Sequence, residues 1–323
     1  MLFSLRRRRN DQTVLGTPAL AGIDDQRSFT ERHSGKAARY DADALGSLQG
    51  DVESIGAWRS ALSVVCADGS IDQAESLTAF NARRYLTLGR ENPSSIRSCV
   101  ERARDNARAA RNSITRDAWE AINRAWLAIR DRSSPGGTQT TLNLIEELSA
   151  DTRGFEGAVA RMLRREGFWF LRLGAVMERG DNTARLLDVK YYLLLPAGER
   201  VGGTLDRDQW TTILHTVSAR NAYRFIYRDA LKPWLIADLL IFRRELPRSL
   251  YAVAEETAHL LGELAERTGR QGEADRLARH RLMEFEEGDI GVLFQAGLHE
   301  SLRRFIAENA ALDQAVACQF RFG

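Results

Sequence analysis

The stretch FLRLGAVMERGDNTARLLDVKY, residues 170–191, decides the fold class of this chain. At about 100° per residue it predicts one long helix with two distinct faces. We expect that helix over residues 168–195, because Pro196 follows it. The apolar face carries Leu173, Val176, Gly180 and Leu187. The opposite face is polar, spans an arc of about 100°, and consists of Glu178, Asp181, Asn182 and Arg185.

The polar face of this helix has two interpretations. The plain one is a solvated face joined by ion pairs, since Asp181 and Arg185 form an i, i+4 pair with the acid first. Gly174 and Gly180 weigh against it, because each costs a helix about 1 kcal/mol relative to alanine. Close contact between helices is a reason to keep such glycines. The polar face around Glu178 is then expected to meet another helix or a ligand.

A similar segment occurs earlier in the chain. In both copies a Glu-Arg pair is followed six and seven positions later by Ala-Arg. The residues of the earlier copy are Glu101, Arg102, Asn106 and Arg108. A weaker echo is Glu31-Arg32, and the strings Asn92-Pro93-Ser94-Ser95 and Leu246-Pro247-Arg248-Ser249 both resemble helix starts. These echoes predict an internally duplicated helical unit, with chance similarity in an Ala-, Arg- and Leu-rich chain as the alternative.

The rest of the chain favours an all-α helical bundle. No segment alternates with period two for long enough to predict a strand, and the prolines fall where helices should begin or end. The last helix is expected over residues 290–318. Residues 1–50 are polar, lack a 3.6-residue period, and are expected to form a poorly ordered arm. The expected helical domain is residues 51–320, with a first half over 51–132, a Ser-, Pro- and Gly-containing linker over 133–141, and a second half over 142–320.

Composition excludes several classes of protein. The 323 residues include 46 basic and 44 acidic side chains, a net charge of +2, which argues against a dedicated partner of nucleic acid or anionic membranes. The 3 cysteines lie far apart, which excludes a disulfide framework and fits a reducing compartment. No apolar run approaches the ~20 residues of a transmembrane helix. We therefore expect a cytoplasmic protein.

The motifs of common catalytic and metal sites are missing from the sequence. None of the 5 histidines forms an H-E-x-x-H or H-x-x-x-H pair. Glu256 and His259 form a single E-x-x-H motif, whereas a di-metal helical bundle needs two. The pair His299-Glu300 fits a structural role better than a metal site. We expect no metal and no cofactor.

Further candidates come from aromatic residues and lysines. Tyr191 and Tyr223 fit core aromatics with satisfied hydroxyl groups, and a ligand-stacking box is the alternative. Lys190 and Lys232 stand out in a chain whose basic residues are almost all arginines. The candidate polar site or interface in the second half comprises Glu178, Arg179, Asp181, Asn182, Arg185, Asp188, Lys190, Tyr191, Tyr223, Lys232, His299 and Glu300.

At these residues the chain resembles the alpha-E family, a bacterial all-helical family named for a conserved Glu-Arg motif. The resemblance covers about residues 57–320. Its matching strings are Asn92-Pro93-Ser94-Ser95-Ile96, Trp119-Glu120-Ala121-Ile122-Asn123, residues 177–196, residues 231–241, Leu246-Pro247-Arg248-Ser249-Leu250 and Gly297-Leu298-His299-Glu300. Family members begin with a further Glu-Arg helix that residues 1–50 do not resemble, and Glu31-Arg32 is a candidate remnant of it.

The resemblance implies a context rather than a reaction. Family members tend to be encoded beside circularly permuted ATP-grasp proteins that resemble peptide ligases, and beside transglutaminase-like peptidases. A role in making or processing a peptide is therefore implied, with those two proteins as suspected partners.

Three functions stay open at this point. The first is a non-catalytic partner of an ATP-dependent peptide-ligation system, binding through the polar face around Glu178. The second is an enzyme in which Glu178 acts as acid or base and Arg179 or Arg185 holds an anion. The third is a purely structural helical scaffold.

Overall fold

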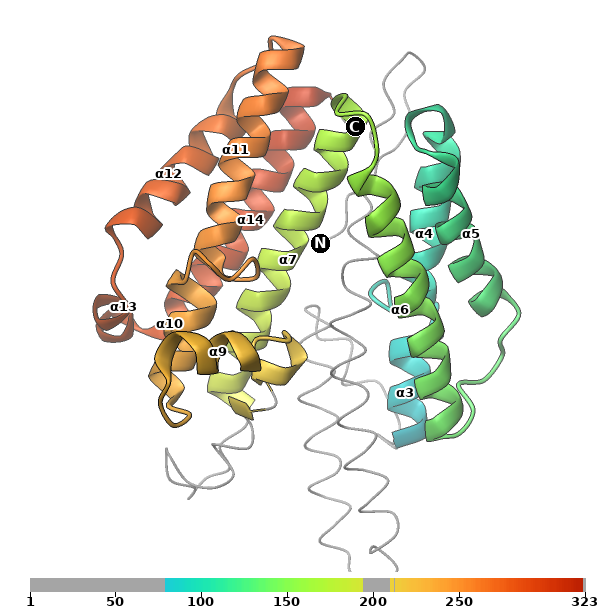
Figure 1. Cartoon of the computed structure of the whole chain (residues 1–323), viewed down its shortest axis with the longest axis horizontal. Helices are drawn as coiled ribbons and strands as arrows, with labels where there is room; N and C mark the ends of the chain where they lie inside the picture. The colour runs from blue at the N-terminus through green and yellow to red at the C-terminus, as the bar shows by residue number, and fades with distance from the viewer. Residues whose placement is uncertain (1–78, 194–209, 212, 322–323) are drawn as a thin grey trace, which may run out of the picture. The chain divides into compact units, whose positions relative to one another are not determined.

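The structure is a computed structural model that describes residues 79–193, 210–211 and 213–321. Within these residues every regular element is a helix, and no strand occurs (Figure 1). The predicted all-α fold is therefore confirmed. The predicted arm, residues 1–50, lies outside the described residues.

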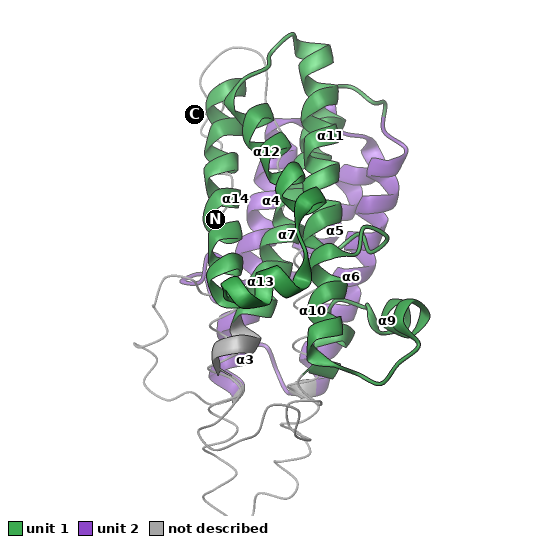
Figure 2. Ribbon diagram, turned by 90° about the vertical axis from the view of Figure 1, so that its left-hand side faces the viewer, with its two compact units in different colours: residues 1–18, 163–323 green, residues 19–162 purple. Residues whose placement is uncertain are grey.

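The helices form two compact units, which Figure 2 colours separately. The described part of the α4–α6 unit, residues 79–162, contains α3 (Ala79–Thr87), α4 (Ile96–Ala109), the 3₁₀ helix η2 (Arg111–Ser113), α5 (Arg116–Arg130) and α6 (Thr138–Ala160). The described part of the α7 unit, residues 163–321, contains α7 (Glu166–Leu193), α9 (Arg220–Tyr227), α10 (Pro233–Phe242), α11 (Leu250–Thr268), α12 (Glu273–Glu287), α13 (Ile290–Ala296) and α14 (Leu298–Phe320). The units divide after Met162, whereas the sequence places the linker between halves at residues 133–141. The end of that linker, residues 138–141, belongs to α6.

In the α4–α6 unit, α5 packs against both α4 and α6. Val100 of α4, Ile129 of α5 and Ile145 of α6 are fully buried in its core. The side chain of Arg97 is also buried, and its Nη2 donates a hydrogen bond of 2.8 Å to the Ile129 carbonyl. This bond joins α4 to the end of α5, where the Ile129 carbonyl also accepts a hydrogen bond of 3.3 Å from the Arg132 amide.

In the α7 unit, α7 packs against α11 and α14, and α12 packs against the same two helices (Figure 1). The predicted apolar face of α7 is the buried one. At its centre, a Cβ added to Gly180 would lie 2.7 Å from Val253 Cγ1 of α11 and 3.3 Å from Phe305 Cζ of α14. Gly180 therefore marks a close approach of α7 to α11 and α14. The energetic cost of glycine within a helix predicts such a contact.

The two repeated proline strings begin helices in the same way. Ser95 caps α4 and Ser249 caps α11, each with an extended backbone, and their side chains accept hydrogen bonds from the amides of Ser98 and Ala252. Both caps are completely buried. The sequence echo thus corresponds to a repeated local structure, a helix whose N-cap serine lies two residues after a proline.

The prediction of a single helix over residues 290–318 is wrong. The chain breaks at Gly297, whose φ of +99° lies in a region that residues with a Cβ rarely adopt, and α13 and α14 lie on either side of it. The apolar period continues across this residue, so periodicity alone does not reveal the break.

Substitution of Gly180 by alanine tests the close approach. Because Val253 is a stiff β-branched side chain in the core, Gly180→Ala is expected to lower the free energy of unfolding by about 1–3 kcal/mol. The matched control is Gly262→Ala on α11, where nothing lies within 4 Å of an added Cβ. That change is expected to stabilise by about 0.5–1 kcal/mol. Urea denaturation measures both, and equal effects at the two sites would contradict the packing described.

Candidate functional site

The side of α7 that faces α11 carries two arginines that share one carboxylate. Arg179 Nη1 lies 3.7 Å from Glu256 Oε2, and Arg172 Nη2 donates a hydrogen bond to Glu256 Oε1. The Arg179 side chain is only 18% exposed. Interactions between charged groups in such a setting are stronger than at an open surface. Arg179, a candidate site residue, thus contributes to the attachment of α7 to α11.

The side of α7 that faces α14 carries two acidic residues. Arg185 Nε donates a hydrogen bond of 2.7 Å to Asp181 Oδ2, which is the i, i+4 pair that the sequence predicts. About two turns beyond Asp181, Asp188 Oδ1 lies within hydrogen-bond distance of His299 Nδ1, at the start of α14. The structure therefore brings together Asp188 and His299, which the sequence predicts only as separate site residues.

A third carboxyl group, Asp313 of α14, belongs to this side. Burial raises its pKa to about 6, and the negative charge of Asp181 on α7 contributes in the same direction. Its Oδ1 is buried and accepts no hydrogen bond from any described residue. A carboxyl group with such a pKa is partly protonated near neutral pH, so it can both donate and accept a proton.

The third side of α7 is turned away from α11 and α14. Glu178, Asn182 and Arg185 lie within about 40° of the direction opposite Gly180. Each residue is partly exposed, although Glu178 Oε2 itself is buried. Carboxylate, amide and guanidinium groups thus stand in a row along two turns of one helix. We call these three residues the outer face of α7.

Tyr223 and Lys232 lie elsewhere in the α7 unit, at the turn between α9 and α10. The Tyr223 ring is fully buried, its hydroxyl donates a 2.7 Å hydrogen bond to the Ala230 carbonyl, and it accepts one of 3.1 Å from the Lys232 amide. Burial raises the pKa of this hydroxyl. The Lys232 ammonium is exposed and pairs with Asp229 at 2.5 Å. These contacts fit the core-aromatic interpretation of Tyr223 and the surface interpretation of Lys232.

Three candidates remain, namely Glu300, Lys190 and Tyr191. Glu300 Oε2 lies against Gly297, in the first turn of α14, where a carboxylate is favoured by the helix dipole. Lys190 and Tyr191 belong to α7, but their side chains lie outside the described part of the chain.

The residues of the earlier Glu-Arg copy belong to α4, in the α4–α6 unit. Arg90 Nη2 donates a hydrogen bond of 3.1 Å to Glu101, and Arg102 donates one to the Pro93 carbonyl. Asn106 is partly exposed and Arg108 is exposed. The Glu-Arg pair of α4 therefore holds the loop that precedes α4, through Arg90 and Pro93.

Three polar residues that interact with α7 do not figure among the sequence candidates. Glu256 is visible only as part of an E-x-x-H motif, and Asp313 gives no signal in the sequence. Asn309 interrupts the apolar stripe of α14, and its Nδ2 donates a hydrogen bond of 3.0 Å to the Met177 carbonyl. A polar residue at an apolar period is the signal that could have identified it.

Neither a metal-binding cluster nor a membrane-spanning helix occurs among the described residues. No group of three or more His, Cys, Asp or Glu side chains in that part of the chain could hold a metal ion. None of the helices described above combines the length and apolarity needed to cross a membrane.

The geometry thus defines an all-helical protein organised around a Glu-Arg helix. A comparison with protein families matches residues 30–320 to Alpha-E, described as a predicted alpha-helical domain with a conserved ER motif. That match covers most of the chain, so the chain belongs to the Alpha-E family. It begins earlier than the expected residue 57, just before Glu31-Arg32. No curated protein and no solved structure matches the chain.

The raised pKa of Asp313 predicts a pH-dependent stability. The folded protein binds this proton more tightly than the unfolded chain, so stability from it is present at pH 4 and is lost as pH rises through about 6. Asp313→Asn is therefore expected to stabilise the protein at pH 7.5, on the order of 1 kcal/mol after allowance for partial exposure. The stabilisation by Asp313→Asn should become smaller toward pH 4.

Denaturation by urea at pH 4.5 and pH 7.5 measures this difference. The exposed carboxylate of Asp131, 77% accessible, provides the control Asp131→Asn, which should change the free energy of unfolding little. An Asp313→Asn effect that does not change with pH would contradict the assignment.

Tyr223→Phe tests the turn between α9 and α10. The change removes one hydroxyl and leaves the Ala230 carbonyl and the Lys232 amide without that partner. It is expected to lower the free energy of unfolding by about 1–3 kcal/mol. Lys232→Ala, which removes an exposed pair, should leave the denaturation midpoint unchanged. The reverse order of effects would show that the lysine, not the tyrosine, holds the turn.

Proposed function

We propose that this Alpha-E protein is a non-catalytic binding partner in a cytoplasmic system that makes or modifies a peptide. The partners proposed are an ATP-grasp protein that resembles peptide ligases and a transglutaminase-like protein, as the family resemblance implies. The observation that carries the proposal is the outer face of α7, where Glu178, Asn182 and Arg185 stand in a row away from the core.

The other two sides of α7 support this role. Ion pairs with Glu256 of α11 and the contact with His299 of α14 hold the helix in one orientation. The direction of the outer face is therefore set by contacts within the α7 unit. Binding to a fixed surface loses less conformational entropy than binding to one that must first be ordered. Its charged and amide groups suit a polar partner surface with complementary charge.

One observation favours an enzyme as the alternative, with its acid or base on α14, which packs against α7. The carboxyl group whose pKa lies near neutrality is Asp313, beside Asp181, and this is a usual property of a proton-transfer group. In that case the acid or base is Asp313 rather than Glu178, and Asp181, whose charge acts on Asp313, is held by Arg185. Turnover of a peptide or nucleotide substrate by the purified chain alone would favour this alternative.

Co-purification tests the binding role. The chain is co-expressed with an ATP-grasp-like protein of the proposed kind, and the complex is measured by size-exclusion chromatography and titration. The triple variant Glu178→Gln, Asn182→Ala, Arg185→Gln is expected to bind at least about tenfold more weakly, because charged contacts at an interface contribute several kcal/mol. The control, Glu273→Gln with Arg276→Gln, alters an exposed pair on α12 and should bind normally.

Thermal denaturation of each variant separates loss of binding from loss of folding. A wild-type chain that elutes alone beside its folded neighbour would overturn the proposal. So would a triple variant that binds as tightly as the wild type.

A further inference from the structure

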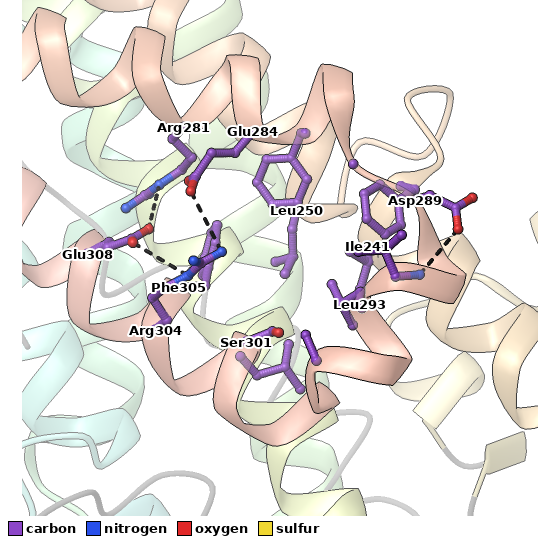
Figure 3. Close-up of a pocket in the computed structure, with 16 residues that line it drawn as sticks. Ile241, Leu250, Arg281, Glu284, Asp289, Leu293, Ser301, Arg304, Phe305 and Glu308 are labelled. Carbon is purple, nitrogen blue, oxygen red and sulfur yellow. Dashed lines mark hydrogen bonds and ion pairs between the residues drawn. The ribbon is translucent and has the colours of Figure 1, made fainter.

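A cavity of about 190 Å³ lies among α10, α11, α12, α13 and α14 in the α7 unit (Figure 3). Most of its wall is apolar, and the principal apolar side chains are Ile241, Phe242, Leu250, Phe285, Leu302 and Phe305. An engineered apolar cavity of about 150 Å³ binds benzene. The space therefore suits a ligand with one branched or aromatic side chain and a few further atoms.

One end of this cavity is charged. Arg281 and Glu284 of α12 meet Arg304 and Glu308 of α14 there (Figure 3). Arg304 lies 3.7 Å from Glu284 and 3.7 Å from Glu308, and Arg281 lies 4.0 Å from Glu308. All three separations exceed hydrogen-bond length. Two positive and two negative groups are thus close together but only loosely paired.

Arg281 is the most deeply placed of the four. Its side chain is 7% exposed, it stacks over the Phe305 ring at 4.7 Å, and its Nη1 donates a 3.0 Å hydrogen bond to Asn309. Its Nε, also buried, has no hydrogen-bond partner among the described residues. Burial lowers the pKa of this guanidinium. A buried cation with an unused donor is costly unless a further acceptor reaches it.

The charges select among small ligands. Asp289, at the other end of the cavity, already caps α13 by accepting hydrogen bonds from the Gly291 and Val292 amides. A simple carboxylate would satisfy the arginines but would face Glu284 and Glu308 as like charges. A simple amine would pair with the glutamates but would face Arg281 and Arg304 as like charges. A zwitterion matches both signs, because its carboxylate can approach Arg281 and Arg304 while its ammonium approaches the glutamates.

We propose that this cavity binds a free hydrophobic α-amino acid. The ammonium and carboxylate groups lie among Arg281, Glu284, Arg304 and Glu308, and the side chain occupies the apolar part between α10 and α13. This inference concerns α10 to α14 alone and does not depend on the role of the outer face of α7.

Isothermal titration with three probes tests the charge requirement. L-leucine is compared with 4-methylpentanoate, which lacks the amine, and with 3-methylbutylamine, which lacks the carboxylate. L-leucine is expected to bind, and each analogue to bind at least about tenfold more weakly, because each leaves two charged side chains unmatched. Equal binding of leucine and either analogue overturns the zwitterion assignment, and absence of binding by all three overturns the site.

Two variants place the ligand in the cavity. Arg304→Gln removes an arginine that is 64% exposed, and it should weaken leucine binding at least tenfold without unfolding the protein. Ala296→Trp, at an exposed position of the lining, should fill the space and abolish binding. Arg276→Gln, on the same helix as Arg281 but outside the lining, should leave binding unchanged. Leucine binding that persists in both cavity variants, with unchanged thermal denaturation, would show that the amino acid binds elsewhere.

Discussion

The close approach of α11 and α14 to α7 at Gly180 sets the arrangement of the whole α7 unit. With Val253 and Phe305 packed where a side chain would otherwise stand, α7 has one rotation that keeps its apolar face buried. That rotation directs Arg179 toward Glu256, and Asp188 toward His299. It also turns Glu178, Asn182 and Arg185 away from the core. The division of α7 into packed sides and an outer face thus follows from one steric contact.

The charged groups of the unit differ in how firmly they are held. On α7, Arg185 donates a hydrogen bond of 2.7 Å to Asp181, whereas the arginines beside the cavity lie 3.7 to 4.0 Å from their carboxylates. Partly buried ion pairs contribute specificity of orientation more than net stability. A loosely paired cluster at the end of an apolar cavity retains the capacity to exchange one partner for a ligand.

The two candidate surfaces therefore suit different kinds of partner. The outer face of α7 is a row of polar groups on a rigid helix, a form that suits a protein surface. The cavity among α10 to α14 is small, apolar and closed by charges at one end, a form that suits a small molecule. The break at Gly297 contributes to the cavity, because it separates α13 from α14 and lets α13 approach α10.

The sequence by itself determined the all-α class, the two faces of α7, and the serine caps after Pro93 and Pro247. It also indicated the close contact at Gly180, because glycine destabilises a helix unless another element needs the space. These features depend on local periodicity and on residue types with strong backbone preferences, which act between near neighbours in the chain. It did not reveal Glu256, Asp313 or the cavity around Arg281, and it predicted one helix where Gly297 divides two. The tertiary structure alone decided those features. Ion pairs between helices, and the burial that shifts a pKa, depend on how helices distant in sequence are rotated and packed against one another.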